Sequence, residues 1–351
     1  MSIYESKTYI MDLFNVTKEF KELDLLRNSS ILITGATGLI CSSVVDILLK
    51  SNEINKTNIH IYAAGRNEPK MRERFAEYLH NDKFHYVRYD ATKDNKLDID
   101  VDYVIHGASN AYPSIIAMHP VETMLSNFMG IQQLLELART KSIKRVLYIS
   151  SSEIYGLKTT KEPFKEDEYG YIDILNSRNS YSSAKRASET LCISYTKEFE
   201  LDTVIVRPGH IYGPTASKDD NRVSSMFAYN VVEGKNIILK SAATQVRSYC
   251  YIMDCATAIL TVLLKGSKGE AYNISNRDSM ISIKHLSELF AKYGNVTIKY
   301  ENPNYIEKVG FNPMTDSSLS SLKLEELGWR GKFDAELGVM RTLQVLKELK
   351  E

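Results

Sequence analysis

Tyr181 and Lys185 are suited to acid–base chemistry, because they stand four residues apart at the start of a helix-like stretch, "NSYSSAKRASETLCISYTKEF". That spacing places both side chains on one face of a helix. A phenol, with a pKa of about 10, is a poor base at neutral pH, but a neighbouring ammonium favours the phenolate. The pair could then take the proton of an alcohol or sugar hydroxyl as a hydride leaves its carbon. Tyr-x-x-x-Lys is also common on solvated helix faces, so its weight depends on where it stands in the fold.

A second group of polar side chains lies in "YISSSEIYG", where Ser150, Ser151 and Ser152 precede Glu153. The apolar residues before them predict a buried strand that ends at Ser150. Ligands of doubly wound α/β proteins bind outside the carboxyl ends of the strands, so these hydroxyls are placed to hydrogen-bond a substrate. Serines that merely cap the strand end are an equally common interpretation.

A third pattern, "SILITGATGLICSSVVDILL", contains Gly35 and Gly38 and has Cys41 where a third glycine is expected in a dinucleotide-binding loop. Its order of apolar strand, turn and helix is the context in which such a motif binds a pyrophosphate at the helix N-terminus. Gly35 would allow the tight turn, and Gly38 would let backbone amides approach the phosphates. Cysteine is small and tolerates burial, so we expect Cys41 to widen the helix–strand contact slightly and to leave binding intact. The alternative is an ordinary turn before a buried helix.

These patterns need a scaffold, and apolar strand segments that alternate with helical segments predict a doubly wound parallel α/β (Rossmann) sheet. The predicted strands are Ile31–Ile33, Ile59–Ala64, Phe84–Tyr89, Tyr103–His106, Val146–Ser150 and Thr203–Val206, and the predicted helices span 39–51, 68–80, 120–140, 180–199 and 223–233. We expect a helical extension over 1–28 and a dinucleotide-binding domain over 29–208, to which 251–266 returns. Residues 209–250 and 267–351 would form a smaller, interwoven C-terminal α/β substrate lobe.

The composition is that of a globular protein: 351 residues, 43% hydrophobic, 25% charged, with 44 basic and 44 acidic side chains. The balanced charge argues against nucleic acid as a partner. The four cysteines lack zinc-type spacing, so we expect no metal site and reduced, intracellular thiols. We find neither a signal-type segment nor an apolar run of about 18 residues, so we expect a soluble, cytoplasmic protein with no membrane partner.

Taken together, the motifs resemble the extended short-chain dehydrogenase/reductase family, which comprises nucleotide-sugar epimerases, dehydratases and decarboxylases. The resemblance runs from about residue 29 through nearly the whole chain. In chain order it rests on "TGATGLIC", "SSSEIYG", "YSSAK", "RPGHIYGP", "VRSYCYIMD" and "LEELGW".

The resemblance implies a role for each matching residue. Tyr181 would be the general base, Lys185 its ribose-binding partner, and Ser151 the hydrogen-bond partner of the sugar C4 hydroxyl. The NAD or NADP cofactor would be tightly bound, by Gly35, Thr37, Gly38, Leu39, Ile40, Arg66, Asp90, Ala91, Gly107, Ala108, Ser109, Lys185 and Pro208. Arg247 would contact the diphosphate of a nucleotide-diphosphate sugar, and Arg222 would do so too unless it is a surface loop residue. His210 stands where the family usually has an asparagine facing the substrate, and the family implies a homodimer formed through a helix bundle.

Arg66 bears on the choice of cofactor. The second predicted strand ends in "YAAGRN", without the acidic residue that would bind a ribose 2′-hydroxyl. Arg66 could receive a 2′-phosphate, which favours NADP, or could merely stack on adenine, which leaves NAD open.

Glu153 bears on the choice of reaction. In relatives with a glutamate at this place, oxidation at C4 is followed by dehydration or decarboxylation, and Ser152 occupies the place of the acid in 4,6-dehydratases. Ser-Ser-Glu resembles the Thr-Ser-Glu of UDP-glucuronate decarboxylases, and Arg178, Arg186 and Glu189 favour the same group. The alternatives are a 4-epimerase, an NADPH-dependent keto-sugar reductase, and a non-catalytic dinucleotide sensor.

Overall fold

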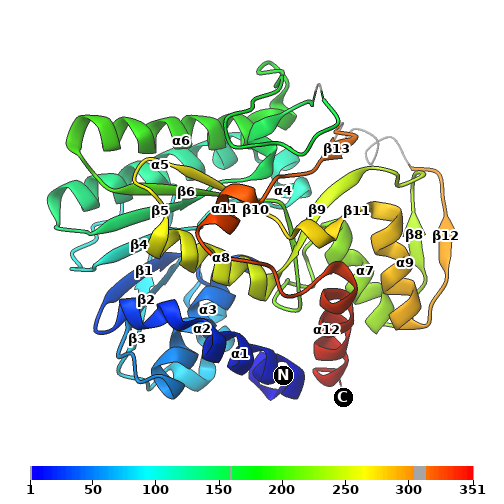
Figure 1. Ribbon diagram of the computed structural model, residues 1–351, viewed down its shortest axis with the longest axis horizontal. Coiled ribbons are helices and arrows are strands. Elements are labelled where there is room, and N and C mark those ends of the chain that lie inside the picture. The colour runs from blue at the N-terminus through cyan, green and yellow to red at the C-terminus, as the bar shows by residue number, and fades with distance from the viewer. Residues whose placement is uncertain (1, 159, 304–313, 351) are drawn as a thin grey trace.

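The computed structural model describes residues 2–158, 160–303 and 314–350. Its main feature is a parallel sheet whose seven strands are β1 (Ser30–Thr34), β2 (His60–Gly65), β3 (Phe84–Arg88), β4 (Tyr103–His106), β5 (Arg145–Ile149), β6 (Thr203–Pro208) and β10 (Ala271–Ile274). They lie in the order β10-β6-β5-β4-β1-β2-β3 (Figure 1). The order reverses direction between β1 and β4, and in such sheets the crevice at this switch point takes the ligand. The predicted fold class is therefore confirmed.

Helices cover both faces of this sheet. They are α2 (Leu39–Ile54), α3 (Glu68–Arg74), α4 (Pro113–Met118), α5 (Pro120–Thr140), α6 (Ser180–Phe199) and α8 (Ile252–Lys265). Helix α5 packs along α6 on one face, and α2 packs along α8 on the other (Figure 1). Ile31 and Ile33 of β1 join the core on the α2 side, whereas Leu32 joins the core on the α5 side. All three are fully buried, which explains the unbroken apolar run of this strand.

The smaller lobe contains two further sheets. One consists of β7 (His210–Tyr212), β9 (Val246–Tyr251), β11 (Met280–Ser282) and β13 (Asp316–Ser317); the other pairs β8 (Ile237–Leu239) with β12 (Ile298–Tyr300). Its helices are α7 (Val223–Val232), α9 (Ile283–Gly294) and α12 (Ala335–Glu348), whereas α11 (Leu322–Glu326) packs against β10 of the large sheet.

Two predicted boundaries are wrong. Strand β10 lies in a range assigned to the smaller lobe, yet it pairs with β6 in the large sheet. The return helix α8 brings the chain back to that sheet, so the next apolar segment completes a crossover there. The helix predicted over 68–80 ends at Arg74 and is followed by a 3-10 turn, Ala76–Tyr78. Phe75 leaves the helical conformation (φ −117°, ψ 33°), and its buried ring packs on Phe84 at 5.1 Å between centroids.

The N-terminal extension contains α1 (Lys7–Glu19) between the 3-10 turns Ile3–Glu5 and Lys21–Leu26. Tyr4 and Tyr9 both donate hydrogen bonds to the buried Asp46 carboxylate of α2. Thr8 and Ser6 donate to Glu348 of α12. The extension therefore joins the first helix of the large sheet to the last helix of the smaller lobe. Among the described residues there is no helix with the length and apolar character needed to cross a bilayer.

Candidate active site

Gly35 is required by the chain itself. Its φ of +71° is a conformation that L side chains rarely adopt, and a Cβ there would lie 2.9 Å from backbone atoms of Gly107 and Ala108. The amides of these two residues also face the Thr34 hydroxyl, at 3.3 Å each. The ends of β1 and β4 therefore meet closely at the switch point of the sheet.

Gly38 has no such requirement. It precedes α2 with φ −80° and ψ 165°, which any residue can adopt, and an added Cβ would meet only the Gly35 carbonyl oxygen, at 3.1 Å. No side chain hydrogen-bonds to the first-turn amides of α2, and Gly38 places no side chain of its own beside them. This open helix end fits the pyrophosphate of a dinucleotide, which needs close backbone approach and free N–H groups. Thr37, Leu39 and Ile40 belong to the same turn and the first turn of α2.

Cys41 packs against the end of β4. Its side chain is buried, and its Sγ lies only 2.3 Å from where a Cβ on Gly107 would stand. The sulfur thus occupies the space that the absent side chain of Gly107 leaves. The sequence suggested that cysteine would be tolerated, but it did not show that Gly107 provides the room.

Tyr181 lies in the first turn of α6 beside Ser151, which follows β5, and the two hydroxyls interact. The pKa of Tyr181 is raised to about 12, chiefly by burial and also by the Glu153 charge, although Ser151 and Arg222 act to lower it. Lys185 donates from Nζ to the Ile149 carbonyl at 2.7 Å, with Nζ 5.6 Å from the centre of the Tyr181 ring. Burial lowers the pKa of Lys185 to about 7. The expected lowering of the Tyr181 pKa by Lys185 therefore stays a prediction, and in this structure burial has the larger effect.

Glu153 is paired with a residue for which the sequence suggested no contact. Arg178, in the 3-10 turn Ser177–Asn179 before α6, donates to both carboxylate oxygens at 3.3 and 3.4 Å. Within the described part of the chain, the buried Arg178 Nε has no hydrogen-bond acceptor. The signal was present, because Arg178 stands three residues before Tyr181 and so shares the mouth of the site. Ser152 is buried in the 3-10 turn Ser152–Tyr155 that also carries Glu153.

The smaller lobe contributes three further predicted residues, Arg247, His210 and Arg222, near Tyr181 and Glu153. Arg247 of β9 is 4% exposed, and its guanidinium donates to the carbonyls of Val246 and Met314. Burial lowers the pKa of Arg247, and burial together with Arg247 and Arg222 lowers the pKa of His210 to about 3. Arg222 is not a free surface arginine, because it forms an ion pair with the buried Asp220.

The model of the NAD dependent epimerase/dehydratase family matches residues 31–275. The chain belongs to this family. Its relatives include decarboxylases and dehydratases of nucleotide sugars, and this chain is an NAD-dependent enzyme.

Two curated relatives of the epimerase/dehydratase family cover nearly the whole chain. UDP-glucuronic acid decarboxylase 3 of Arabidopsis thaliana is 29% identical over 332 residues, which are 93% of this chain and 93% of that protein. The dTDP-D-glucose 4,6-dehydratase of Homo sapiens is 26% identical over 327 residues, which are 91% of this chain and 90% of that protein.

Solved structures of the family show the same fold. UDP-glucuronic acid 4-epimerase from Bacillus cereus, solved with UDP-glucuronic acid and NAD, has a TM-score of 0.77 and 23% identity over 91% of this chain and 99% of that chain. UDP-glucose 4-epimerase from Thermotoga maritima, solved with UDP-glucose, has a TM-score of 0.77 and 22% identity over 92% of this chain and 100% of that chain.

In this NAD-dependent family member the predicted adenine-side residues form a separate group. Arg66, at the end of β2, is 60% exposed and forms an ion pair with Glu122 at 3.2 Å. Asp90 accepts hydrogen bonds from Thr92, and Arg66 is among the groups that lower its pKa. Arg66 therefore lies among carboxylates, and these compete with a 2′-phosphate for its charge. Of the other predicted cofactor residues, Ala91 is buried shortly after β3, Pro208 is the buried last residue of β6, and Ser109 follows β4.

Gly38→Val is expected to remove most of the bound cofactor, because the added side chain would stand between the α2 amides and the pyrophosphate. Cys41→Gly is the matched control on the same turn and should retain cofactor, because it only leaves space beside Gly107. The cofactor released from each purified, denatured protein is measured. Equal cofactor content in Gly38→Val and the unchanged protein would place the cofactor elsewhere.

Proposed function

We propose that the substrate of this enzyme is a nucleotide sugar that carries a carboxylate on C5. The enzyme oxidises this sugar at C4 and then decarboxylates it, as a UDP-glucuronic acid decarboxylase does. The observation that carries the proposal is the Arg178–Glu153 pair beside Tyr181 and Ser151. Arg178 has a buried Nε without an acceptor among the described residues, and an anionic sugar substituent would supply one. The decarboxylase relative named above supports the same choice.

The proposed chemistry assigns a task to each of these side chains. When bound beside these residues, NAD would supply the acceptor for the C4 hydride and the donor for its return once carbon dioxide has left. Ser151 holds the C4 hydroxyl, and Tyr181 takes its proton and gives it back to the same oxygen when the C4 carbonyl is reduced at the end of the cycle. In the resulting 4-keto sugar the bond from C5 to the carboxylate breaks, carbon dioxide leaves, and the electron pair passes into the C4 carbonyl as an enolate. C5 then gains a proton that comes from water, and Glu153 is the group placed to relay it.

Binding of the nucleotide diphosphate is assigned to the smaller lobe. Arg247 is buried, forms no ion pair among the described residues although Asp316 and Glu153 lie near enough to act on its charge, and donates to two backbone carbonyls. An arginine in this state suits a diphosphate oxygen, because charge-assisted hydrogen bonds would offset its burial. Arg222 carries its own counter-charge in Asp220 and so contributes less net charge. His210, held neutral by burial, offers a hydrogen bond rather than a charge.

Dehydration is the second candidate. A carboxylate at Glu153 could remove the C5 proton of a 4-keto sugar, but the C6 hydroxyl must then leave with a proton. Ser152, a buried hydroxyl, is a far weaker acid than a carboxylic acid, which favours decarboxylation. Incubation with UDP-glucuronic acid and dTDP-glucose, followed by mass spectrometry, distinguishes the two. Loss of carbon dioxide supports the proposal, loss of water supports dehydration, and an unchanged mass with a new isomer supports 4-epimerisation.

We propose NAD as the working cofactor. Glu122 already pairs with Nη1 of Arg66, and Asp90 adds a second negative charge nearby. A 2′-phosphate would have to displace Glu122 and approach both carboxylates, whereas a ribose hydroxyl would not. The sequence favours NADP only while Arg66 is considered without these two carboxylates. The four cysteines are buried and unpaired, which supports the expected cytoplasmic location.

We also propose that the enzyme is a homodimer formed through α5. One stripe of this helix is apolar yet exposed, and its members follow helical spacing: Val121 (70% exposed), Met124 (44%), Leu125 (46%) and Phe128 (40%). Neighbouring exposed apolar residues include Met129 of the same helix and Ile193 of α6. A contiguous apolar surface of this kind marks a protein–protein contact, and a second copy of the chain supplies a matching stripe by symmetry.

Phe128→Glu is expected to convert the dimer to a monomer, because two carboxylates would face one another across the symmetric contact. Analytical ultracentrifugation measures the mass in solution. Leu25→Glu is the control, since Leu25 is 63% exposed on the N-terminal extension and lies away from α5. A dimer that survives Phe128→Glu, or a monomeric starting protein, contradicts this interface.

A further inference from the structure

Two consecutive cations of α6 hold the two ends of the segment that carries Ser151 and Glu153. At the near end, Lys185 donates to the carbonyl of Ile149, the last residue of β5. At the far end, Arg186 donates from Nε to the carbonyl of Ile154 at 2.6 Å. The helix that supplies Tyr181 thus also fixes the segment that supplies its neighbours.

Arg186 joins two separate pieces of backbone. Besides Ile154, its Nη2 donates to the carbonyl of Gly170 at 2.8 Å and faces that of Tyr155 at 3.4 Å. The same backbone pieces pair directly, through hydrogen bonds from Gly170 to Tyr155 and from Leu157 to Tyr171. A planar guanidinium can serve several carbonyls at once, which an ammonium on a flexible stem does not reproduce. Arg186 therefore holds the turn immediately after Glu153 against the backbone at Gly170. We call this set of hydrogen bonds the clasp.

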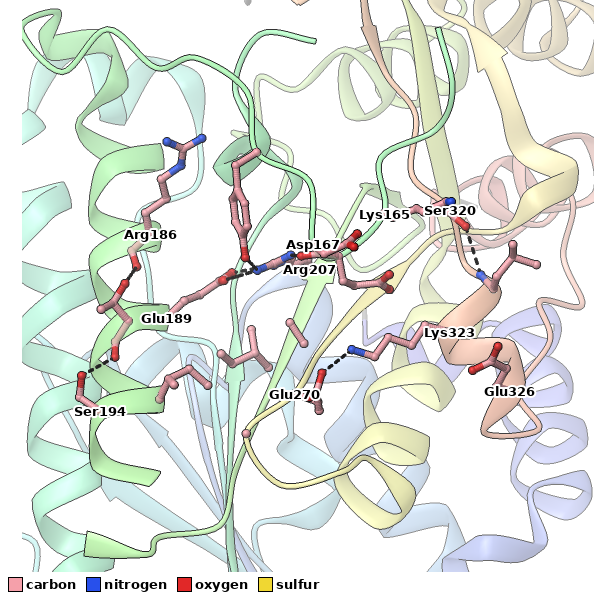
Figure 2. A pocket seen from close by; sticks show the side chains of 18 of the residues that line it. Lys165, Asp167, Arg186, Glu189, Ser194, Arg207, Glu270, Ser320, Lys323 and Glu326 are labelled. Carbon is pink, nitrogen blue, oxygen red and sulfur yellow. Dashed lines mark hydrogen bonds and ion pairs between the residues drawn. The ribbon is translucent and has the colours of Figure 1, made fainter. Parts of the chain in front are cut away.

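A second anchor lies one turn further along α6. Arg207, at the end of β6, forms a buried ion pair with Glu189 and donates to the Tyr155 hydroxyl at 2.9 Å. Figure 2 shows Arg207 directed toward Glu189, with Arg186 extending from the preceding turn of the same helix. The turn after Glu153 is thus held through its carbonyls by Arg186 and through its tyrosine by Arg207.

Arg186 and Arg207 line a cleft of about 890 Å³ on the side of α6 facing β10 and α11 (Figure 2). Because Arg186 is only partly buried and borders this open space, removing its guanidinium leaves the helix core intact. Helix α6 is packed through other residues, including Cys192 and Tyr195. A substitution here is expected to loosen the turn rather than unfold the protein.

We propose that Arg186 is a positioning residue that sets the placement of Glu153, and thereby the stage of the reaction that follows C4 oxidation. The expected effect on the reaction rests on the proposed function. The expected effect on the backbone rests on the hydrogen bonds of Arg186 alone. Ser151 lies at the near end, which Lys185 and Tyr181 hold, so the first oxidation depends less on Arg186. Misplacement of a reacting group by about 1 Å can cost about 10²-fold in rate.

The test compares Arg186→Met and Arg186→Lys with the unchanged enzyme, using UDP-glucuronic acid in single turnover. Formation of reduced nicotinamide should remain close to the unchanged rate in both variants. Formation of UDP-pentose should slow by about 10–100-fold in Arg186→Met, with partial recovery in Arg186→Lys. Lys197→Met is the control, because this exposed lysine borders the same cleft on the same helix.

Amide hydrogen exchange tests the backbone contacts of Arg186 without any substrate. In Arg186→Met the amides of Leu157 and Gly170 should exchange faster, while those of β5 and α6 keep their protection. If both kinetic stages fall together, or neither changes, Arg186 does not position Glu153. If exchange is unchanged, the clasp itself is refuted. If the unchanged enzyme leaves UDP-glucuronic acid untouched while exchange responds as expected, the proposed function fails and the clasp stands.

Discussion

Replacing Tyr181 with phenylalanine is expected to lower kcat by about 10²–10⁴-fold, the usual loss when a general acid–base group is removed. The hydroxyl interacts with Ser151, and Lys185 and Glu153 are its charged neighbours. Since burial raises the pKa of this phenol to about 12, the protein alone disfavours the phenolate. The positive charge of oxidised nicotinamide acts in the opposite direction when it binds. The variant should fold, keep its cofactor, and form little reduced nicotinamide with substrate.

Tyr195→Phe is the matched control. It removes a hydroxyl from the same helix, but that hydroxyl donates to Glu136, away from the site. Rates are measured in stopped flow with cofactor content determined in parallel. Full activity in Tyr181→Phe would mean that another group takes the C4 proton, and the assignment of the base would be wrong.

Replacing Glu153 with glutamine is expected to separate the two stages of the reaction. Glutamine keeps the size of the side chain but loses the charge that Arg178 pairs with at 3.3 Å. Oxidation at C4 should still produce reduced nicotinamide, because Tyr181 and Ser151 are retained. Later steps should slow by about 10²-fold or more, so that a 4-keto sugar accumulates and little UDP-pentose is released.

The 4-keto sugar is measured by mass spectrometry after quenching, with Glu198→Gln on the exposed side of α6 as the control. Wild-type turnover by Glu153→Gln would make Glu153 structural, and a simple 4-epimerase would become the better explanation. Loss of the first oxidation would instead show that Glu153 acts together with Tyr181.

Local patterns predicted the scaffold well. The apolar run Ile31–Ile33, the turn at Gly35 and the helical spacing after it reflect short-range preferences, and each is found as β1, the turn and α2. The helix over 180–199 and the strand Tyr103–His106 have the predicted ends. Strand β10 was missed because four residues, "AYNI", carry too little periodicity to reveal which sheet they join.

Contacts between segments that are distant in the sequence could not be predicted from local patterns. Cys41 and Gly107 compensate for one another across 66 positions, and only the fold places them together. The sequence leaves Arg222 as either a diphosphate ligand or a surface loop residue, and its ion pair with Asp220 is found only in the fold, as is the ion pair of Arg66 with Glu122. Arg178 and Arg186 were noted as residue types typical of a group of relatives. Their partners, a carboxylate and three backbone carbonyls, depend on how the segment after β5 lies against α6.

The central claim is that the bound cofactor is reduced when the sugar is oxidised at C4 and is reoxidised before the product leaves. Single-turnover absorbance of reduced nicotinamide, measured with ordinary and with C4-deuterated UDP-glucuronic acid, tests it most directly. We expect the signal to rise, more slowly with the deuterated sugar, and to return to its starting value as UDP-pentose appears. A signal that never rises, that rises equally fast with both sugars, or that stays high as product accumulates would contradict this account.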